Sequence, residues 1–218
     1  MLAGGAAGPR QVWAAGLYGE RLQQCGGHDG GWTDFGPLRR ITRSQGDVLY
    51  ELHGRPALDL YQEYLGRVAD GLPNAALLFP LSIRAPRSGS QPLVRTILDI
   101  DEKSRSMTFA GDMPHGNVAG LMHTTDEGLV NSAGNALAQA TCGMVGTPQN
   151  LAISVSCVGR PLVLGERAEE EVESLEQGVP TGAAHVGLYL HGEIAHGRDG
   201  GVSQLHSQTL AVTVLCEA

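Results

Sequence analysis

The clearest alternation of apolar and polar residues in this chain runs from Ala183 to Ile194. Its even positions are apolar apart from Gly192, and they carry Ala184, Val186, Leu188, Leu190 and Ile194. Because side chains alternate between the two faces of a strand, the pattern predicts a strand whose even residues face a core. The odd positions carry His185, Gly187, Tyr189, His191 and Glu193. That second face is either exposed to solvent or lines a site.

Other short apolar runs lie between turn-forming residues, which is typical of strands. These runs cover residues 48–52, 77–83, 93–100, 106–110, 117–122, 151–158 and 206–216. Residues 93–110 are expected to form a hairpin, because residues 101–104 have the composition of a turn. In its first strand, Val94, Leu98 and Ile100 are expected to point inward.

Three segments have the spacing of three to four residues between apolar positions that indicates a helix. They are residues 56–69, 124–142 and 166–177. Pro56 suits the first position of the first helix, while Thr124 and Glu127 form a capping box for the second, which Gly143 ends. In the third, the run of residues 169–171 is expected to be a solvated acidic face. Strands that mostly follow one another predict an α+β fold, with a mostly antiparallel β-sheet and about three packed helices.

Composition and charge restrict the possible partners. The chain has 218 residues, 42% of them hydrophobic and 17% charged, as in an ordinary globular protein. Its net charge is −8 and Lys103 is its only lysine, which argues against nucleic acid or an anionic membrane as partner. No apolar run is long enough for a membrane span or a signal peptide. Cys25, Cys142, Cys157 and Cys216 form no CxxC pair, so free thiols and a cytoplasmic location are expected.

The common catalytic motifs are absent: the sequence has no GxGxxG after a strand, GxxxxGK[ST], HExxH or GxSxG. His191 and Glu193, with His185 on the same face, have the side chains of metal ligands. Residues two apart on one face are about 7 Å from each other, so a zinc site would need a third strand. A metal site, a polar small-molecule site and a solvated face all stay open for this segment.

The segment from Ser156 to Arg160 follows an apolar strand and offers two reactive side chains. Arg160 could hold a carboxylate with two hydrogen bonds, or form a structural ion pair with one of the many acids. Cys157 continues the apolar alternation, which indicates a structural thiol. As a nucleophile it would need a neighbouring histidine or cation to lower its pKa.

Several motifs together resemble a known family. They are Gly30-Gly31-Trp32-x-x-Phe35-Gly36-Pro37, Thr42-Arg43-Ser44, the block from Val48 to Tyr61, Phe79-Pro80-Leu81, Ser156-Cys157-x-Gly159-Arg160, Gly187-x-Tyr189-x-x-Gly192-Glu193-Ile194 and His206-x-x-Thr209-Leu210. In order and spacing they are similar to the FIST proteins over nearly the whole chain. His53 stands where an acid is common in that family, and Ser207 stands where asparagine is expected.

The resemblance implies a division into two parts. Residues 1–52 would be the end of a FIST N-half, most of which is missing, and residues 53–218 a FIST C-type domain. It further implies an intracellular sensory module of signal-transduction proteins, proposed to bind small ligands such as amino acids. A signalling output partner or a second copy of the chain would then be the protein partner.

The resulting hypothesis is a ligand-binding domain without catalysis, cofactor or metal. Its site residues would be Arg160, Tyr189, His191, Glu193 and Cys157, with Arg160 on a ligand carboxylate and Glu193 on an ammonium group. One alternative is a cysteine- or metal-assisted hydrolase that uses Cys157 with His191. Another is a protein-interaction module that needs the missing N-terminal half.

Overall fold

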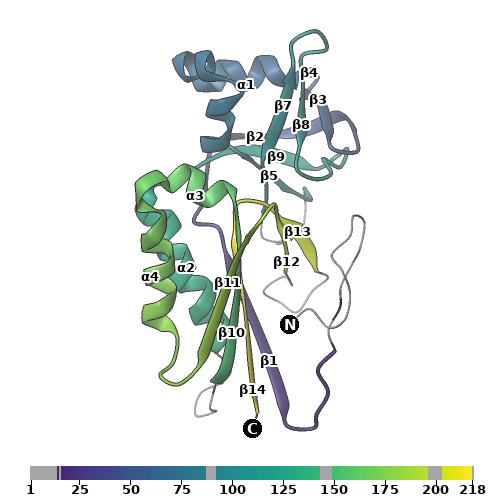
Figure 1. Ribbon diagram of the computed structural model, residues 1–218. Helices are drawn as coiled ribbons and strands as arrows, with labels where there is room; N and C mark the ends of the chain where they lie inside the picture. Colours follow the sequence, from purple (N-terminus) through teal and green to yellow (C-terminus); the bar gives the residue numbers. More distant parts are fainter. Residues whose placement is uncertain (1–13, 15, 87–91, 143–148, 196–202, 218) are drawn as a thin grey trace, which may run out of the picture.

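A computed structural model of the chain describes residues 14, 16–86, 92–142, 149–195 and 203–217, and shows two units placed end to end (Figure 1). Residues 33–123 form one unit, which is inserted after the first strand of the other. The second unit is therefore assembled from both ends of the described chain.

The inserted unit is one curved antiparallel sheet. Its strands are β2 Thr33–Gln45, β3 Val48–Leu52, β4 Arg55–Pro56, β5 Leu81–Arg84, β6 Leu93–Arg95, β7 Ile97–Asp101, β8 Ser106–Phe109 and β9 Val118–His123. They pair in the order β6-β5-β9-β2-β3-β8-β7, with β4 on β3. Since Thr96 alone separates β6 from β7, the two ends of this order are consecutive in the chain, and the sheet curls around its core.

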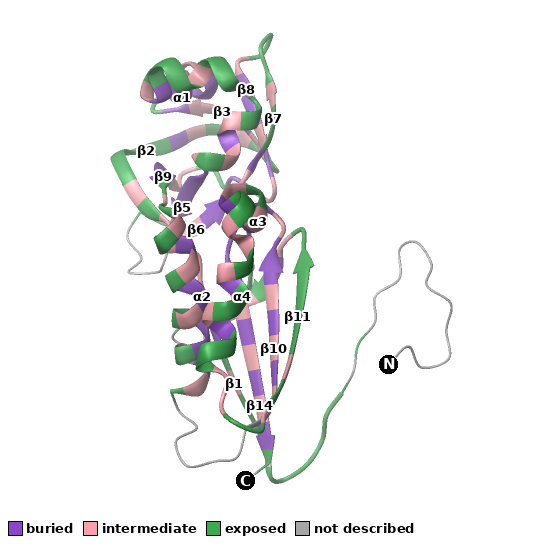
Figure 2. Cartoon of the chain, turned by 60° about the vertical axis from the view of Figure 1, so that its left-hand side comes forward, coloured by how far each residue is buried: buried purple, intermediate pink, exposed green. Residues whose placement is uncertain are grey.

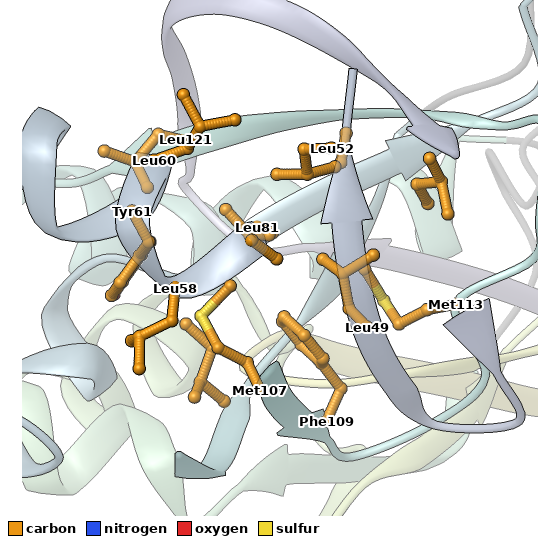
Figure 3. Packing of buried hydrophobic residues seen from close by; sticks show 14 of the residues in the cluster. Leu49, Leu52, Leu58, Leu60, Tyr61, Leu81, Met107, Phe109, Met113 and Leu121 are labelled. Atoms are coloured by element: carbon orange, nitrogen blue, oxygen red, sulfur yellow. The ribbon is translucent and has the colours of Figure 1, made fainter. Parts of the chain in front are cut away.

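One α-helix, α1 Ala57–Leu65, packs against this curled sheet. Two 3-10 turns follow it, η1 Gly66–Gly71 and η2 Asn74–Leu78. The buried face of α1 includes Leu58 and Tyr61, which pack with Leu49, Met107 and Phe109 from the strands (Figure 3). Burying such side chains is the main source of stability for a domain of this size.

The second unit is a four-stranded sheet with helices on one face (Figure 2). Its strands, in the order β1-β14-β10-β11, are β1 Leu22–Asp29, β14 Leu210–Glu217, β10 Gln149–Cys157 and β11 Ala184–Leu190. Its helical segments are α2 Asp126–Thr141, α3 Gly159–Leu164, the 3-10 turn η3 Gly165–Arg167 and α4 Ala168–Gly178. β10 and β11 run parallel because α3 and α4 connect them, whereas the other pairs are antiparallel.

Small residues on α2 allow it to pack closely on the sheet. The core of this unit joins α2, α4, β10 and β14 and contains Ala133, Ala136, Leu137, Ala140, Ala152, Leu175, Leu210, Val212, Val214 and Cys216. A two-stranded ribbon, β12 Glu193–Ala195 with β13 Gln204–His206, joins β11 to β14. The α+β class and the mostly antiparallel pairing predicted from the sequence are confirmed.

Two helix boundaries differ from the expectation. The N-cap of α2 is Thr125, whose hydroxyl accepts from the backbone N–H of Gly128 at 3.0 Å, one residue later than the Thr124 box predicts. The first helix ends at Leu65 rather than near residue 69, because the chain tightens into a 3-10 turn from Gly66 onward. The apolar stripe of α2 is confirmed, since its buried residues include Leu129, Ala133, Ala136, Leu137 and Ala140.

Two strand predictions are wrong in detail. The inward set of the 93–100 strand changes at Thr96: Val94 and Ile97 are buried, whereas Leu98 is 61% exposed. The interruption between β6 and β7 shifts the alternation by one residue, so the side chains after it exchange faces. The strand expected over 77–83 begins only at Leu81, because residues 74–78 form the 3-10 turn η2.

The apolar even face of the 183–194 segment is not a core face, which corrects the first prediction from the sequence. Val186, Leu188 and Leu190 are 47%, 55% and 45% exposed. The segment also divides into β11 and β12 at Gly192, whose backbone turns the chain away. The odd residues of β11 face the helices instead, because they pair with the buried residues Ala152, Ser154 and Ser156 of β10.

The hydrophobic core of the inserted unit crosses the division expected between residues 52 and 53. Ile41 and Leu52, before it, share one cluster with Leu58 and Leu81, after it. One expectation, the helix end at Gly143, lies outside the described residues.

Candidate functional site

A cavity of about 260 Å³ lies between α4 and the strands β10 and β11. Its lining combines hydroxyls, an imidazole and carboxylates with apolar side chains: Ser154, Ser156, Glu171, Val172, Leu175, Glu176, His185, Gly187, Leu188, Tyr189 and Leu210. The hydroxyls and the imidazole come from alternate residues of two neighbouring strands, which places them together on the helix-facing side of the sheet, and the two carboxylates come from α4.

Gly187 leaves the space in which the serine hydroxyl lies. It is the cross-strand partner of Ser154, and a Cβ on Gly187 would approach Ser154 Oγ to 2.8 Å. Ser154 Oγ is also 2.9 Å from Nε2 of His185, in a hydrogen bond whose donor depends on the histidine tautomer. Because Gly187 has no side chain, the Ser154 hydroxyl can lie beside it and form its hydrogen bond with His185 at the wall of the cavity.

A buried ion pair supports the cavity from behind. Arg160 Nε donates to Glu171 Oε2 at 2.6 Å, and both side chains are almost fully excluded from solvent. Ser156 Oγ donates to the other oxygen of Glu171 at 2.7 Å. Both carboxylate oxygens are thus hydrogen-bonded, which offsets part of the cost of burying the charge.

The remaining donors of Arg160 bind other parts of the chain. Its Nη1 donates to the carbonyl of Gly30 at 3.1 Å, and its Nη2 donates to the carbonyl of Leu129 at 2.8 Å and to Ser132 Oγ at 3.0 Å. All three nitrogens are used within the chain. Arg160 therefore ties the segment that follows β1 to α2 and α4, and it reaches the cavity only through Glu171.

Tyr189 lines the cavity directly and is 44% exposed. Burial of its ring raises the pKa of the phenol, and the nearby charge of Glu171 raises it further. The phenol is consequently a neutral hydrogen-bonding group at physiological pH.

Glu193 lies apart from this cavity, on the ribbon strand β12. Its Oε1 accepts from the backbone N–H of Thr209 at 3.2 Å and from the Thr209 hydroxyl, while Oε2 has no hydrogen-bond partner among the described residues. Burial raises the pKa of this carboxyl to about 7, although the hydrogen bonds from Thr209 and the charge of Arg160 oppose the shift.

His206 is the cross-strand partner of Glu193 in the ribbon and is also buried. Burial lowers its pKa to about 4, and the neighbouring His28 and Arg95 lower it further. Its ring lies 4.5 Å from that of His28 on β1, measured between centroids. Burial therefore shifts the pKa values of Glu193 and His206 in opposite directions, because it disfavours the charged form of each group.

The other two expected site residues occupy different surroundings. His191 is exposed in the bend between β11 and β12. Cys157 is buried, and burial raises the pKa of its thiol, as does the charge of Glu193. A protonated, shielded thiol is a poor nucleophile, and His191 is exposed while Cys157 is not, which disfavours this pair as a catalytic unit.

The structure therefore brings Tyr189 to the cavity, places Arg160 behind it and leaves Glu193, Cys157 and His191 outside its lining. Sequence reasoning missed Ser154, Ser156 and Glu171. The expectation of a solvated 169–171 face is wrong for Glu171, which is 1% exposed. Its position four residues before the buried Leu175 was the available signal, since such residues share a helix face.

Among the described residues, no group of three or more His, Cys, Asp or Glu side chains could hold a metal ion. No described helix combines the length and the apolar composition that a membrane crossing requires.

The fold and the site define an α+β domain with a small polar cavity between one helix and the edge of a sheet. Residues 57–196 match the FIST C domain, and the chain belongs to this family. FIST C domains are a family of sensory domains in signalling proteins. The matched range extends from α1 to just beyond β12, so it contains every residue of the cavity lining except Leu210. No curated protein and no solved structure matches this sequence.

Proposed function

We propose that this chain is a cytoplasmic sensory domain that binds an amino acid or a related small carboxylate, without catalysis, in the cavity between α4, β10 and β11. The observation that carries the proposal is a cavity lined by convergent polar groups in a family of sensory domains. Such a cavity with a few fixed polar groups is the usual form of a small-molecule site.

The size of the cavity favours a small metabolite. Its volume of about 260 Å³ is below the range of about 300–1,000 Å³ that is usual for drug-sized ligands. Val172 and Leu175 supply an apolar wall, against which a short aliphatic side chain would pack.

The polar groups suit the two ends of an amino acid. Ser154, His185 and Tyr189 offer hydrogen-bond donors to a carboxylate, and the carboxylates of Glu171 and Glu176 favour an ammonium group. Arg160 takes a different role from the one expected from the sequence. It would position Glu171 rather than touch the ligand, because its donors are already used.

Thermal unfolding against a panel of amino acids and small carboxylates tests the proposal. A ligand at 100 times its dissociation constant stabilises the folded chain by about 2.7 kcal/mol, which raises the melting temperature by several degrees. His185→Ala is expected to abolish the shift. His115→Ala, at an exposed turn, is the matched control and should leave it unchanged. A panel that gives no shift, or a shift that survives His185→Ala, would contradict the assignment.

A further inference from the structure

The charges that line the cavity between α4, β10 and β11 are unbalanced. Glu171 and Glu176 of α4 contribute two carboxylates. None of the described lining residues is an arginine or a lysine. The one lining side chain that can become a cation is His185, and its Nε2 already shares a hydrogen bond with Ser154. The cavity therefore offers stronger partners to the positive end of a ligand than to its negative end.

The arginines around the cavity are engaged elsewhere in the chain. In the described part of this unit they are Arg21, Arg160 and Arg167. Arg21 and Arg167 form ion pairs with acidic side chains outside the cavity lining, and each nitrogen of Arg160 is hydrogen-bonded. Lys103, the only lysine of the chain, belongs to the inserted unit. A ligand carboxylate would thus find no unpaired arginine or lysine among these residues.

The two lining carboxylates differ in what they can give a ligand. A carboxylate has about four acceptor positions, and Glu171 uses one on each oxygen, for Ser156 and Arg160. It keeps acceptor capacity for a donor in the cavity, although Arg160 compensates its charge. Glu176 is exposed and forms no ion pair with a described residue. The uncompensated negative charge of the lining therefore comes from Glu176.

The end of α4 adds to this preference for a cation. Glu176 lies in the last turn of α4, which contains no basic residue. The carbonyl groups at a helix C-terminus carry a partial negative charge, which a nearby cation stabilises. A ligand ammonium group beside Glu176 would meet both the carboxylate and this partial charge.

The remaining lining selects a short hydrocarbon chain. Val172, Leu175 and Leu188 form the apolar part of the wall together with Leu210. A volume of about 260 Å³ is below that of sites for drug-sized ligands, so the chain attached to the ammonium group must be short.

We infer that the ammonium group of the ligand, rather than a carboxylate, determines binding in this cavity, which accordingly takes short aliphatic primary amines as a class. The inference rests on the proposed function, because it concerns the same cavity. An amino acid belongs to this class through its ammonium group, whereas a carboxylate without an ammonium group does not.

Probes of one chain length separate the two charges. Butylamine carries only the ammonium group, α-aminobutyrate carries both charges, and butyrate and N-acetyl-α-aminobutyrate carry only the carboxylate. Chemical-shift titrations of the isotope-labelled chain at pH 7.5 give the dissociation constants, and the amide signals of β10 and β11 locate the binding. The two amines are expected to bind about tenfold or more tightly than the other probes, because only they form a charge-assisted hydrogen bond with a lining carboxylate.

Glu176→Gln tests the source of the preference. It should weaken the binding of butylamine by roughly threefold, since the charge of an exposed carboxylate is partly screened by solvent. Glu173→Gln removes the same charge from an exposed position of the same helix, outside the cavity lining. It is the matched control and should leave the binding of butylamine unchanged.

The possible failures of the two proposals differ. Butyrate or N-acetyl-α-aminobutyrate that binds as tightly as butylamine would overturn this inference and leave the cavity as a ligand site. Equal weakening by Glu173→Gln and Glu176→Gln would show that the net charge of the chain attracts the amine, and would overturn the assignment to the lining. A chain that binds none of the probes would contradict the proposed function and this inference with it.

Discussion

Arg160 and Glu171 form an ion pair with 2.6 Å between Nε and Oε2, and both side chains are withdrawn from solvent. The arginine follows β10 and the glutamate lies in α4, so the pair connects the strand that ends at the cavity with the helix that covers it. The ion pair therefore fixes the side chain of Glu171, which lines the polar wall of the cavity.

Removal of Arg160 should therefore destabilise the fold. Arg160→Met leaves Glu171 charged and buried with one hydrogen bond fewer, and we expect a loss of about 3–5 kcal/mol in urea unfolding. The double variant Arg160→Met/Glu171→Leu should recover much of this loss, because no uncompensated charge remains. The half-exposed pair of Arg43 with Glu51 is the control, and Arg43→Met should have a far smaller effect. Equal losses in the two single variants would contradict the structural role of Arg160.

Glu193 should make the stability of the protein fall as pH rises. Its pKa is raised to about 7 in the folded chain and is about 4.3 when unfolded. The folded state therefore binds more protons between these values, and its stabilising contribution is complete below pH 4 and lost as pH rises through 7. Glu193→Gln should remove this contribution, which amounts to about 3–4 kcal/mol. Urea unfolding of both proteins from pH 5 to 8 measures the difference, and parallel profiles would refute the assignment.

His206 has the opposite effect over part of the same range. Its pKa of about 4 in the folded chain lies below its unfolded value of about 6.5. Stability from this group is present above pH 6.5 and is lost as pH falls through 4. In Glu193→Gln the unfolding free energy should accordingly rise between pH 4.5 and 6.5. The additional substitution His206→Gln should flatten that rise, and a rise that persists would have to come from another group.

The four cysteines should differ in reactivity according to their burial. Cys142 is exposed, whereas Cys157 and Cys216 are buried. Because burial raises the pKa of the Cys157 thiol, its alkylation by iodoacetamide at pH 7.5 should be roughly tenfold or more slower than that of Cys142. Peptide mass spectrometry over time follows each residue. Labelling of Cys157 as fast as that of Cys142 would revive the cysteine-hydrolase alternative.

Two adjacent glycines of β1 should differ in how far the same substitution destabilises the fold. A Cβ on Gly27 would lie 2.1 Å from the carbonyl oxygen of Ala136 in α2, whereas on Gly26 the nearest atom, the carbonyl oxygen of Val212, is 3.7 Å away. Gly27→Ala should separate α2 from the sheet at a cost of about 1–3 kcal/mol. Gly26→Ala, on the opposite face, should be close to neutral in the same urea unfolding experiment. Equal effects of the two variants would contradict the close approach of α2 to β1.

The sequence by itself determined those helices and strands that follow from the spacing of apolar residues close together in the chain. The apolar spacing within residues 124–142 specified a helix, and the structure buries Ala133, Ala136 and Ala140 on one face of it. The alternation over 184–190 likewise specified a strand with two unlike faces. These predictions hold because backbone geometry alone sets the periods of 3.6 and 2.

Which face would be covered was decided only by the tertiary structure. The apolar side chains of Val186 and Leu188 looked like core residues, yet helices cover the polar side of β11 and leave these two exposed. Glu171 looked like a solvated acid until Arg160, eleven residues earlier, was placed against it. A periodic pattern records how side chains divide between two faces, but the element that packs on each face comes from distant parts of the chain. Burial, pKa and the cavity follow from that packing.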